Sequence, residues 1–448
     1  MKSTRTLSAA ALLLAAFAAG AEAPPAPAAA AAAAAPVLLR CGHVLDPARG
    51  DALDARTLVI ADGRIRSIEA AGYALPGARE VDLTRSTCLP GLIDAHVHLT
   101  MQFGPTTYSD RFRLDPADYA IRGTVYARRT LLAGVTTVRN LGDDGNESLA
   151  LRDAIDAGLI PGPRIVSAGQ PIGSTGGHAD PTDGFRMDLA GDPGPMRGIV
   201  NSPGDAWKAV RQHYKLGADV IKIMPSGGVL DESASGDNPQ MTLAEIRAAV
   251  AAARDYGYRV AAHAHGAEAI RRAVLGGVDS IEHGTFMDAN DMQLMKRHGT
   301  WYVPTITAGE FVAEKARVPG YYPPQVAAKA AAIGPRIMDT AGRAWRAGVR
   351  IAFGTDAGVF PHGENAREFV YLVQAGMPAL EALRTATVNA AALLGHGHEL
   401  GRLAPGYRAD VIAVDGDPLA DIRRMQHVSF VMKDGIVYRQ DGRAIMAQ

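Results

Sequence analysis

The central part of the chain, residues 91–400, alternates short apolar stretches with stretches of helical pattern. Bounded apolar runs of this length are typical of buried strands. They lie at residues 92–99, 135–141, 164–168, 219–224, 259–265, 280–283, 301–306 and 350–354. Strands that alternate with helices pair in parallel, and eight such units close into a barrel. The alternation therefore predicts an α/β fold, a (β/α)8 TIM barrel over residues 91–400.

The two flanks of this region have a different sequence pattern, in which short apolar runs are separated by turns. Residues 37–90 and 401–448 contain such runs, and the steps Asp62-Gly63 and Asp434-Gly435 are typical of hairpin turns. Because the two flanks share this pattern and enclose the α/β region, we predict one small β-sandwich domain built from both chain ends.

The first 36 residues predict export. Lys2 and Arg5 precede an apolar run at 9–19, and Ala21-Glu22-Ala23 matches a signal-peptide cleavage site. We therefore expect a signal peptide at 1–23, cleaved after Ala23, and a Pro/Ala-rich linker at 24–36. The apolar run is too short to span a bilayer as a mature helix, and the sequence offers no other candidate span. A secreted or periplasmic protein is predicted.

The charge balance disfavours whole classes of partner. With 46 basic and 47 acidic residues, the formal net charge is -1, and no basic patch for nucleic acid or an anionic membrane is visible. A small-molecule or dipeptide substrate is the better expectation. We also expect a homo-oligomer.

The two cysteines, Cys41 and Cys88, leave two interpretations open. An exported protein permits a disulfide between them, but two cysteines also suit small buried apolar positions. We favour the second interpretation, in which both thiols stay free.

Polar residues gather at the carboxyl-terminal ends of the predicted strands, where the chemistry of such barrels takes place. They are His96, His98, Lys222, His263, His265, His283 and Asp356. His96 and His98 share one face of their strand, because residues i and i+2 do, so their rings converge. Neutral imidazole suits zinc, nickel or iron. The pattern predicts a metal site at one mouth of the barrel.

Each of these residues also has a structural interpretation. A single histidine can be a core residue bonded to backbone, Asp356 can cap the following helix, and Lys222 can reach the rim or pair with Asp356. The functional alternative for Lys222 is a deprotonated amine that takes up carbon dioxide and becomes a carbamate able to bridge two ions. Because five strands aim such side chains at one mouth, we favour the functional interpretation.

The chain resembles the amidohydrolase superfamily over residues 37–442. The resemblance rests on residues 89–98, 134–139, 220–222, 263–266, 280–284, 354–356 and 401–411. It implies two divalent metal ions, most simply zinc. His96 and His98 would hold the more buried ion, His263 and His283 the other, carboxylated Lys222 would bridge them, and Asp356 would complete the first site.

Within the superfamily, the chain resembles the Xaa-Pro dipeptidase-like (prolidase) and ochratoxin-hydrolysing group. This resemblance implies hydrolysis of an amide bond that releases a C-terminal amino acid from dipeptides or N-acyl amino acids, including N-acyl phenylalanine of the ochratoxin A type. A hydroxide between the metals would be the nucleophile, and Asp356 would carry its proton to the leaving amine.

Three further residues are candidate substrate contacts. His265 shares a strand face with His263 and could bond the substrate carbonyl or carboxylate, although it could also serve packing. His178 lies in a Gly-rich loop after the third predicted strand, where a solvated histidine is the alternative, and Arg139 lies near the end of the second predicted strand. Residues 226–237 after Lys222 are too long for a tight turn, and we expect a lid or specificity loop there.

Two rival functions stay open from the sequence. A cyclic amidase or imidazolonepropionase-like hydrolase would keep the fold and change the bond, and a non-catalytic binding protein would keep the metal as structure. A deaminase that acts on a ring is a further member of the first group, and Lys222 argues against it, because deaminases of this superfamily usually use one metal and lack such a lysine. The second is disfavoured because buried ionisable residues are costly to keep without a use.

Overall fold

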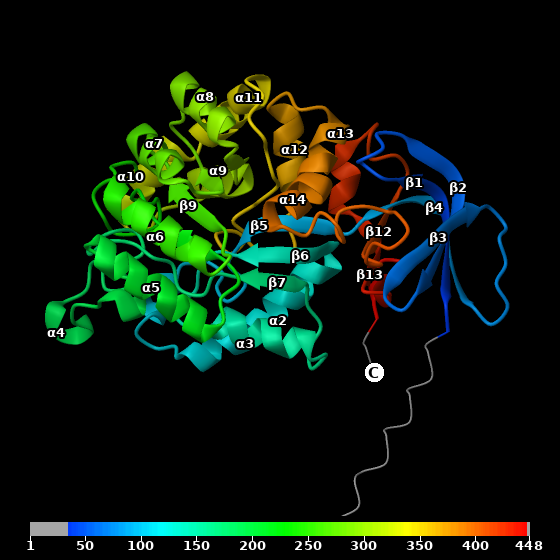
Figure 1. Cartoon of the computed structure of the whole chain (residues 1–448), viewed down its shortest axis with the longest axis horizontal. Coiled ribbons are helices and arrows are strands. Elements are labelled where there is room, and N and C mark those ends of the chain that lie inside the picture. Colours follow the sequence, from blue (N-terminus) through cyan, green and yellow to red (C-terminus); the bar gives the residue numbers. More distant parts are fainter. Residues whose placement is uncertain (1–34, 446–448) are drawn as a thin grey trace, which may run out of the picture. The chain divides into compact units, whose positions relative to one another are not determined.

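The two β-rich flanks of the chain join in one eight-stranded sheet (Figure 1). The computed structural model describes residues 35–445, so the predicted signal peptide at 1–23 lies outside the described residues. The strands are β1 (Val37–Leu45), β2 (Ala52–Ala61), β3 (Arg64–Ala70), β4 (Arg79–Pro90), β12 (Val411–Asp415), β13 (Val428–Lys433), β14 (Ile436–Gln440) and β15 (Arg443–Ala444). Their order is β15-β14-β13-β12-β4-β1-β2-β3, and β1 and β4 are parallel.

This single sheet differs from the expected sandwich of two sheets. Strand β4 pairs with β1 on one side and with β12 on the other, so the two flanks join edge to edge through hydrogen bonds. Leu39, Ile60, Val81 and Phe430 belong to one buried apolar cluster of this sheet. An alternating pattern shows that one face of a strand is buried, but it does not reveal which strand lies beside it.

Both predicted hairpins are confirmed. Ala61 pairs with Arg64 across the first turn, and Lys433 pairs with Ile436 across the second. Asp62 and Asp434 both have positive φ, at 52° and 50°, and the glycine that follows each one is also left-handed. Asp-Gly is the sequence that this kind of two-residue turn prefers.

The cysteines form a disulfide, so the preferred interpretation of two free thiols is wrong. Cys41 lies on β1 and Cys88 on β4, and their Cα atoms are 6.0 Å apart. The two strands are parallel neighbours although 47 residues separate the cysteines in sequence. That pairing brings the sulfur atoms together, and neither spacing nor composition reveals it.

Parallel strands form the central region, as expected. They are β5 (Leu92–Val97), β6 (Val135–Asn140), β7 (Arg164–Ser167), β8 (Ile221–Ile223), β9 (Val260–Ala264), β10 (Ser280–His283) and β11 (Trp301–Val303). They lie in two sheets, β5-β6-β7 and β8-β9-β10-β11, with parallel pairing in both. Seven of the eight predicted strands are thus present. The eighth is reduced to a single bridge between Ile351 and Tyr302.

Helices follow these strands and cover the central region (Figure 1). They include α2 (Pro116–Leu132), α3 (Glu147–Asp156), α5 (Pro203–Leu216), α6 (Leu243–Asp255), α7 (Ala267–Gly276), α8 (Ala289–His298), α9 (Ile306–Lys315), α10 (Pro324–Ile333), α11 (Arg336–Arg346), α12 (Arg367–Gln374), α13 (Ala379–Arg384) and α14 (Ala390–Leu394). Local chemistry defines their ends. At α6, for example, Thr242 and Glu245 form a reciprocal capping box.

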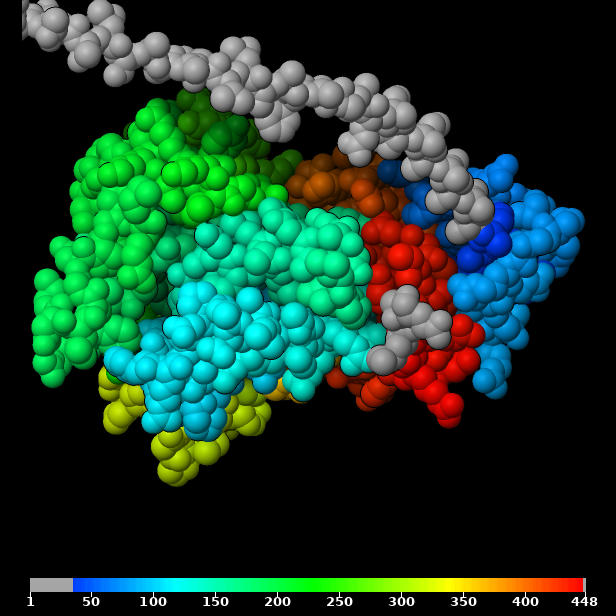
Figure 2. Space-filling model, turned by 90° about the horizontal axis from the view of Figure 1, so that it is seen from below, coloured from blue at the N-terminus to red at the C-terminus, as the bar shows by residue number. Residues whose placement is uncertain are grey.

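The eight-stranded sheet packs against this helical layer. Figure 2 shows the C-terminal strands in red between the N-terminal strands in blue and the cyan segment that carries α2 and α3. Leu45, Leu89 and Val431 of the sheet belong to the same buried apolar cluster as Val135 and Ile165 of the central region. No helix among residues 35–445 is long and apolar enough to cross a membrane.

Candidate active site

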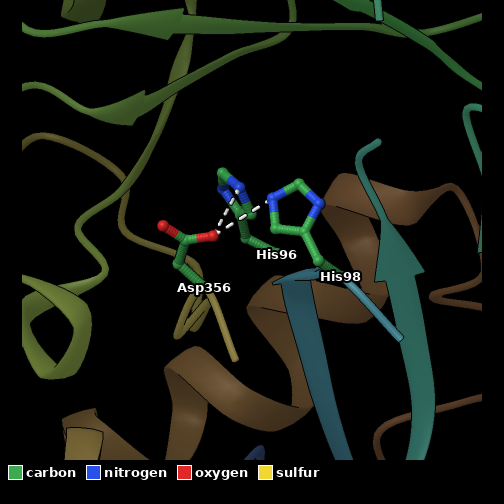
Figure 3. Close-up of side chains that lie close together, drawn as sticks. All are labelled: His96, His98 and Asp356. Carbon is green, nitrogen blue, oxygen red and sulfur yellow. Dashed lines mark ion pairs between the residues drawn. The ribbon is translucent and has the colours of Figure 1, made fainter. Parts of the chain in front are cut away.

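Three of the predicted metal ligands converge at the end of β5 (Figure 3). His96 lies on β5, His98 follows the strand, and Asp356 follows the bridge at Ile351. The Oδ1 atom of Asp356 is 3.4 Å from Nε2 of His96 and 3.2 Å from Nε2 of His98. This oxygen is buried without a hydrogen-bond partner in residues 35–445. A buried carboxylate oxygen that faces two imidazole nitrogens is an arrangement that a divalent cation would satisfy.

The opposite nitrogen of each ring is held by a hydrogen bond. Nδ1 of His96 donates to Oε2 of Glu282 at 2.9 Å, and Nδ1 of His98 donates to the carbonyl oxygen of Gly142 at 2.9 Å. These bonds place the hydrogen on Nδ1 and leave the lone pair of Nε2 free, as in histidines that bind metals.

A second group of histidines adjoins the first. The ring of His283 lies 5.0 Å from that of His96 and 4.6 Å from that of His263, centroid to centroid. Nε2 of His263 donates to the carbonyl oxygen of Gly227 at 3.0 Å, while Nδ1 of His283 is bonded to Oγ1 of Thr305 at 2.7 Å. Each of these rings again has one nitrogen engaged and one free. Burial, reinforced by the neighbouring histidines and Lys222, lowers the pKa of both rings well below the usual value, so they are neutral.

Lys222 lies among these groups on β8. It is 1 % exposed and makes no hydrogen bond or ion pair with any residue of the described chain. Burial lowers the pKa of its amine to about 8, although Glu282 and Asp356 oppose that effect. The amine is therefore uncharged in about a tenth of the molecules at neutral pH, far more often than an exposed lysine. The pairing of Lys222 with Asp356 that the sequence left open is not present in the described chain.

Three residues at the same place have a strained backbone. His283, Thr305 and Asp356 have φ values of 68°, 55° and 61°, in the left-handed region that residues other than glycine rarely adopt. All three line one cavity of about 180 Å³. Strain of this kind persists only where the surrounding structure enforces it, and it clusters at functional sites.

The cavity contains nearly all the predicted site residues. Its polar wall includes His96, His98, Lys222, His263, His265, His283, Asp356 and His178. Its apolar wall includes Met224, Val229, Leu230, Val312, Ile333, Ile337 and Val359. Nδ1 of His265 is bonded to Oγ1 of Thr285 at 2.7 Å, which orients this ring beside the ligand set without making it a member of the compact His96, His98 and Asp356 group.

Arg139 is the exception. It does not line the cavity, so the structure does not support its expected contact with substrate. The guanidinium is 2 % exposed and donates to the carbonyl oxygen of Ala95 at 2.6 Å and to Oε1 of Glu282 at 2.9 Å. Burial alone would raise the pKa of Glu282, but Arg139 and His96 outweigh it and hold that pKa at about 2. Arg139 therefore acts through Glu282, which in turn holds His96.

Arg139→Met is expected to lower the free energy of unfolding by about 3–5 kcal/mol, because it leaves the charge of Glu282 buried with less compensation. Urea denaturation at pH 7 measures the loss. Arg186→Met is the matched control, since Arg186 and Asp188 form a pair whose side chains are 74 % and 65 % exposed. We expect less than about 1 kcal/mol there. A loss at Arg139 no larger than that of the control would contradict this role.

The sequence interpretation did not identify Glu282, Asp231 or Lys329 as parts of the site. Glu282 had a usable indication, because it is a carboxylate inside a buried strand, as Lys222 is an amine inside one. Asp231 lies in a loop that lines the cavity, and Lys329 on α10 reaches it with Nζ 2.7 Å from Oδ1, a contact that only the fold creates.

Comparison with known proteins finds similar hydrolases. The model of the amidohydrolase family matches residues 87–437. Ochratoxinase from Aspergillus niger is 32 % identical over 430 residues, which cover 89 % of this chain and 86 % of the relative. A solved Xaa-Pro dipeptidase with methionine bound in its active site is similar with a TM-score of 0.87 and 46 % identity, over 90 % of this chain and 100 % of that one. A prolidase complexed with N-methylphosphonate-L-proline follows with a TM-score of 0.82 and 32 % identity, over the same shares of the two chains.

These matches define the class of protein as a hydrolase that acts on amide bonds. The chain belongs to the amidohydrolase family, and its relatives include ochratoxinase and Xaa-Pro dipeptidase structures, as the sequence resemblance predicted.

Proposed function

We propose that this chain is a binuclear metal-dependent amidohydrolase that releases the C-terminal amino acid from dipeptides or N-acyl amino acids, including amides of phenylalanine of the ochratoxin type. One observation carries the proposal. Oδ1 of Asp356 has no hydrogen-bond partner among residues 35–445 and faces Nε2 of His96 and His98, while hydrogen bonds hold the other nitrogen of both rings.

The donor set fits two divalent ions. His96, His98 and Asp356 would hold one, His263 and His283 the other, and carboxylated Lys222 would bridge them. Nitrogen donors with one carboxylate suit zinc. When bound, a pair of such ions lowers the pKa of water and polarises a carbonyl group.

Lys222 is suited to carboxylation. Its neutral amine would attack carbon dioxide, forming one N–C bond and releasing one proton, and the product is a carbamate anion. This reaction replaces a buried cation by an anion among groups that would hold cations. Burial favours it, because burial lowers the pKa of the amine to about 8.

The remaining steps belong to side chains that line the cavity. Asp356 would accept the proton of the attacking water and pass it to the nitrogen of the leaving amino acid, which is a poor leaving group without it. His265 and His178 would contact the substrate carbonyl or carboxylate. The three side chains line one cavity, as this division of roles requires.

The apolar wall of the cavity indicates the leaving group. Val312, Ile333 and Ile337 from α9, α10 and the start of α11 form part of this wall. A lysine or arginine side chain against these residues would lose hydration without gaining a partner. We therefore propose an apolar side chain on the released amino acid, which agrees with the methionine in the similar dipeptidase.

The test of this function is an assay for released amino acid. The substrates are N-acyl amino acids and dipeptides that end in Phe, Leu, Met, Pro, Lys or Arg. We expect kcat/KM for Phe, Leu or Met to exceed that for Lys and Arg by at least about 10-fold, because even a small difference in contacts with an apolar pocket changes kcat/KM by this factor. A preference for Lys or Arg would contradict the assignment of the apolar wall. Turnover of cyclic amides alone would favour a ring-opening amidase instead.

We also infer that the central region is a closed (β/α)8 barrel. The two parallel sheets approach each other at two places. Asp219 N donates to the carbonyl oxygen of Ser167 between β7 and β8, and Ala95 N donates to that of Phe353 beside β5. These bonds and the bridge at Ile351 support a continuous ring of strands.

Export remains a proposal that rests on the sequence at 1–23. The disulfide between Cys41 and Cys88 supports it, because structural disulfides persist in oxidising compartments. A homo-oligomer likewise remains a prediction, for which the apparent mass in solution is the measurement.

A further inference from the structure

His178 is held at the cavity wall by a carboxylate. Its Nδ1 is 2.6 Å from Oδ2 of Asp231, and its backbone N–H donates to Oε1 of Gln240 at 2.9 Å. Its ring lies 4.4 Å from that of His263, centroid to centroid. Nε2 makes no hydrogen bond with any residue in the described range, so this atom is available to a molecule in the cavity.

Asp231 is itself fixed from several sides. Ser233 donates to its Oδ1 through both backbone N–H and hydroxyl, and Gly228 N donates to its Oδ2 at 3.0 Å. Lys329 reaches the same carboxylate from α10, with Nζ 2.7 Å from Oδ1. Burial alone would raise the pKa of Asp231, but His178, Lys329 and Ser233 outweigh it and hold that pKa far below its usual range.

Lys329 also fastens the loop that carries Asp231. Its Nζ donates to the carbonyl oxygens of Gly228 and Asp231, at 3.0 and 2.9 Å. The side chains of Lys329 and Asp231 are 9 % and 10 % exposed, so the ion pair is nearly shielded from water. An ammonium group with three protein acceptors has no free donor left for substrate. Lys329 therefore supports the loop that carries Asp231 and does not itself bind substrate.

Gly228 completes the arrangement. A Cβ atom at this position would lie 2.1–2.4 Å from Cε1, Nδ1 and Nε2 of His178. The ring is thus in contact with the backbone of the same loop that Lys329 holds. Any larger residue at 228 would displace the ring from its place beside His263.

We propose that Lys329 and Asp231 are positioning residues for His178: they fix its hydrogen on Nδ1 and aim its free Nε2 at the substrate. This inference rests on the proposed amide hydrolysis, because it assigns a task to groups around that same cavity. The ion pair between Lys329 and Asp231 also joins α10 to the 226–237 loop. In this proposal, the joined loop forms an ordered wall against which the substrate binds.

A double-mutant cycle tests the proposal. Asp231→Asn and Lys329→Met are each expected to lower kcat/KM on the order of 10- to 100-fold, as a misplaced substrate contact does. In a His178→Ala background, the same two substitutions are expected to lower kcat/KM less than about 2-fold further, because their effect passes through His178. Gly228→Ala is expected to lose about as much kcat/KM as His178→Ala does.

The control is Asp46→Asn, which weakens the Arg402–Asp46 ion pair, where Asp46 is 2 % exposed and neither residue lines the cavity. This substitution is expected to cost stability but to leave kcat/KM within about 2-fold. Losses from Asp231→Asn and Lys329→Met that persist in full in the His178→Ala background would overturn the inference and assign both residues to general stability. Absence of hydrolysis by the zinc-loaded wild type would instead contradict the proposed function, so the two failures are distinguishable.

Discussion

Lys222→Ala is expected to lower kcat/KM at least about 1000-fold, equivalent to roughly 4 kcal/mol of transition-state stabilisation. The substitution removes the amine that would become the bridging carbamate, and it leaves a space beside His96, His263 and His283. Metal analysis is expected to show less than two ions per chain. Amino-acid release with the wild type and variant side by side measures the loss.

Two comparisons separate this role from that of an ordinary buried lysine. Lys433 is also buried, at 7 % exposure, and donates to the carbonyl oxygen of Gly162 outside the cavity. Lys433→Ala is expected to cost stability but little activity. In Lys222→Ala, added propionate should restore part of the activity, because it supplies a carboxylate in the space of the carbamate. Rescue by propylamine and not by propionate would show that the lysine acts as a cation.

Asp356→Asn is expected to reduce kcat/KM by about 1000-fold, within the range that a general acid or base contributes. An amide presents one neutral oxygen where the carboxylate faces Nε2 of His96 and His98 at 3.4 and 3.2 Å. It can neither accept the proton from water nor balance the charge of an ion. The expected result is loss of activity together with weaker metal retention on dialysis.

Asp54→Asn is the matched control for this variant. Asp54 also pairs with a histidine, His43, at 3.1 Å, but on the exposed surface of the β-sheet. We expect its activity and metal content to match the wild type. Substantial activity in Asp356→Asn with unchanged metal content would contradict the role of Asp356 in proton transfer.

Much of the fold was predictable because its patterns are local. Apolar runs that alternate with helices revealed seven strands correctly, and the Asp-Gly steps revealed both hairpins. The eighth strand is less regular than predicted, since residues 350–354 have a strand-like pattern but form one bridge, at Ile351. The single sheet and the Cys41–Cys88 disulfide were not predictable, because both depend on which distant strands become neighbours.

In the candidate site, too, local sequence patterns were predictable and contacts between distant segments were not. His96, His98, Lys222 and Asp356 were recognisable because polar residues at the ends of apolar strands need a reason to be there. Arg139 fits that description as well, yet its guanidinium points to Glu282 and not to the cavity. The sequence could show that Arg139 is unusual, but not which carboxylate neutralises it.

The most direct test of the central claim is a zinc titration of chelator-stripped protein, in which hydrolysis of N-acyl phenylalanine is followed as zinc is added in the presence of bicarbonate. We expect negligible activity without metal and a linear rise that breaks at about two zinc ions per chain, the number that the proposed two-metal site requires. Full activity in the stripped protein, or a break at one ion per chain, would contradict it.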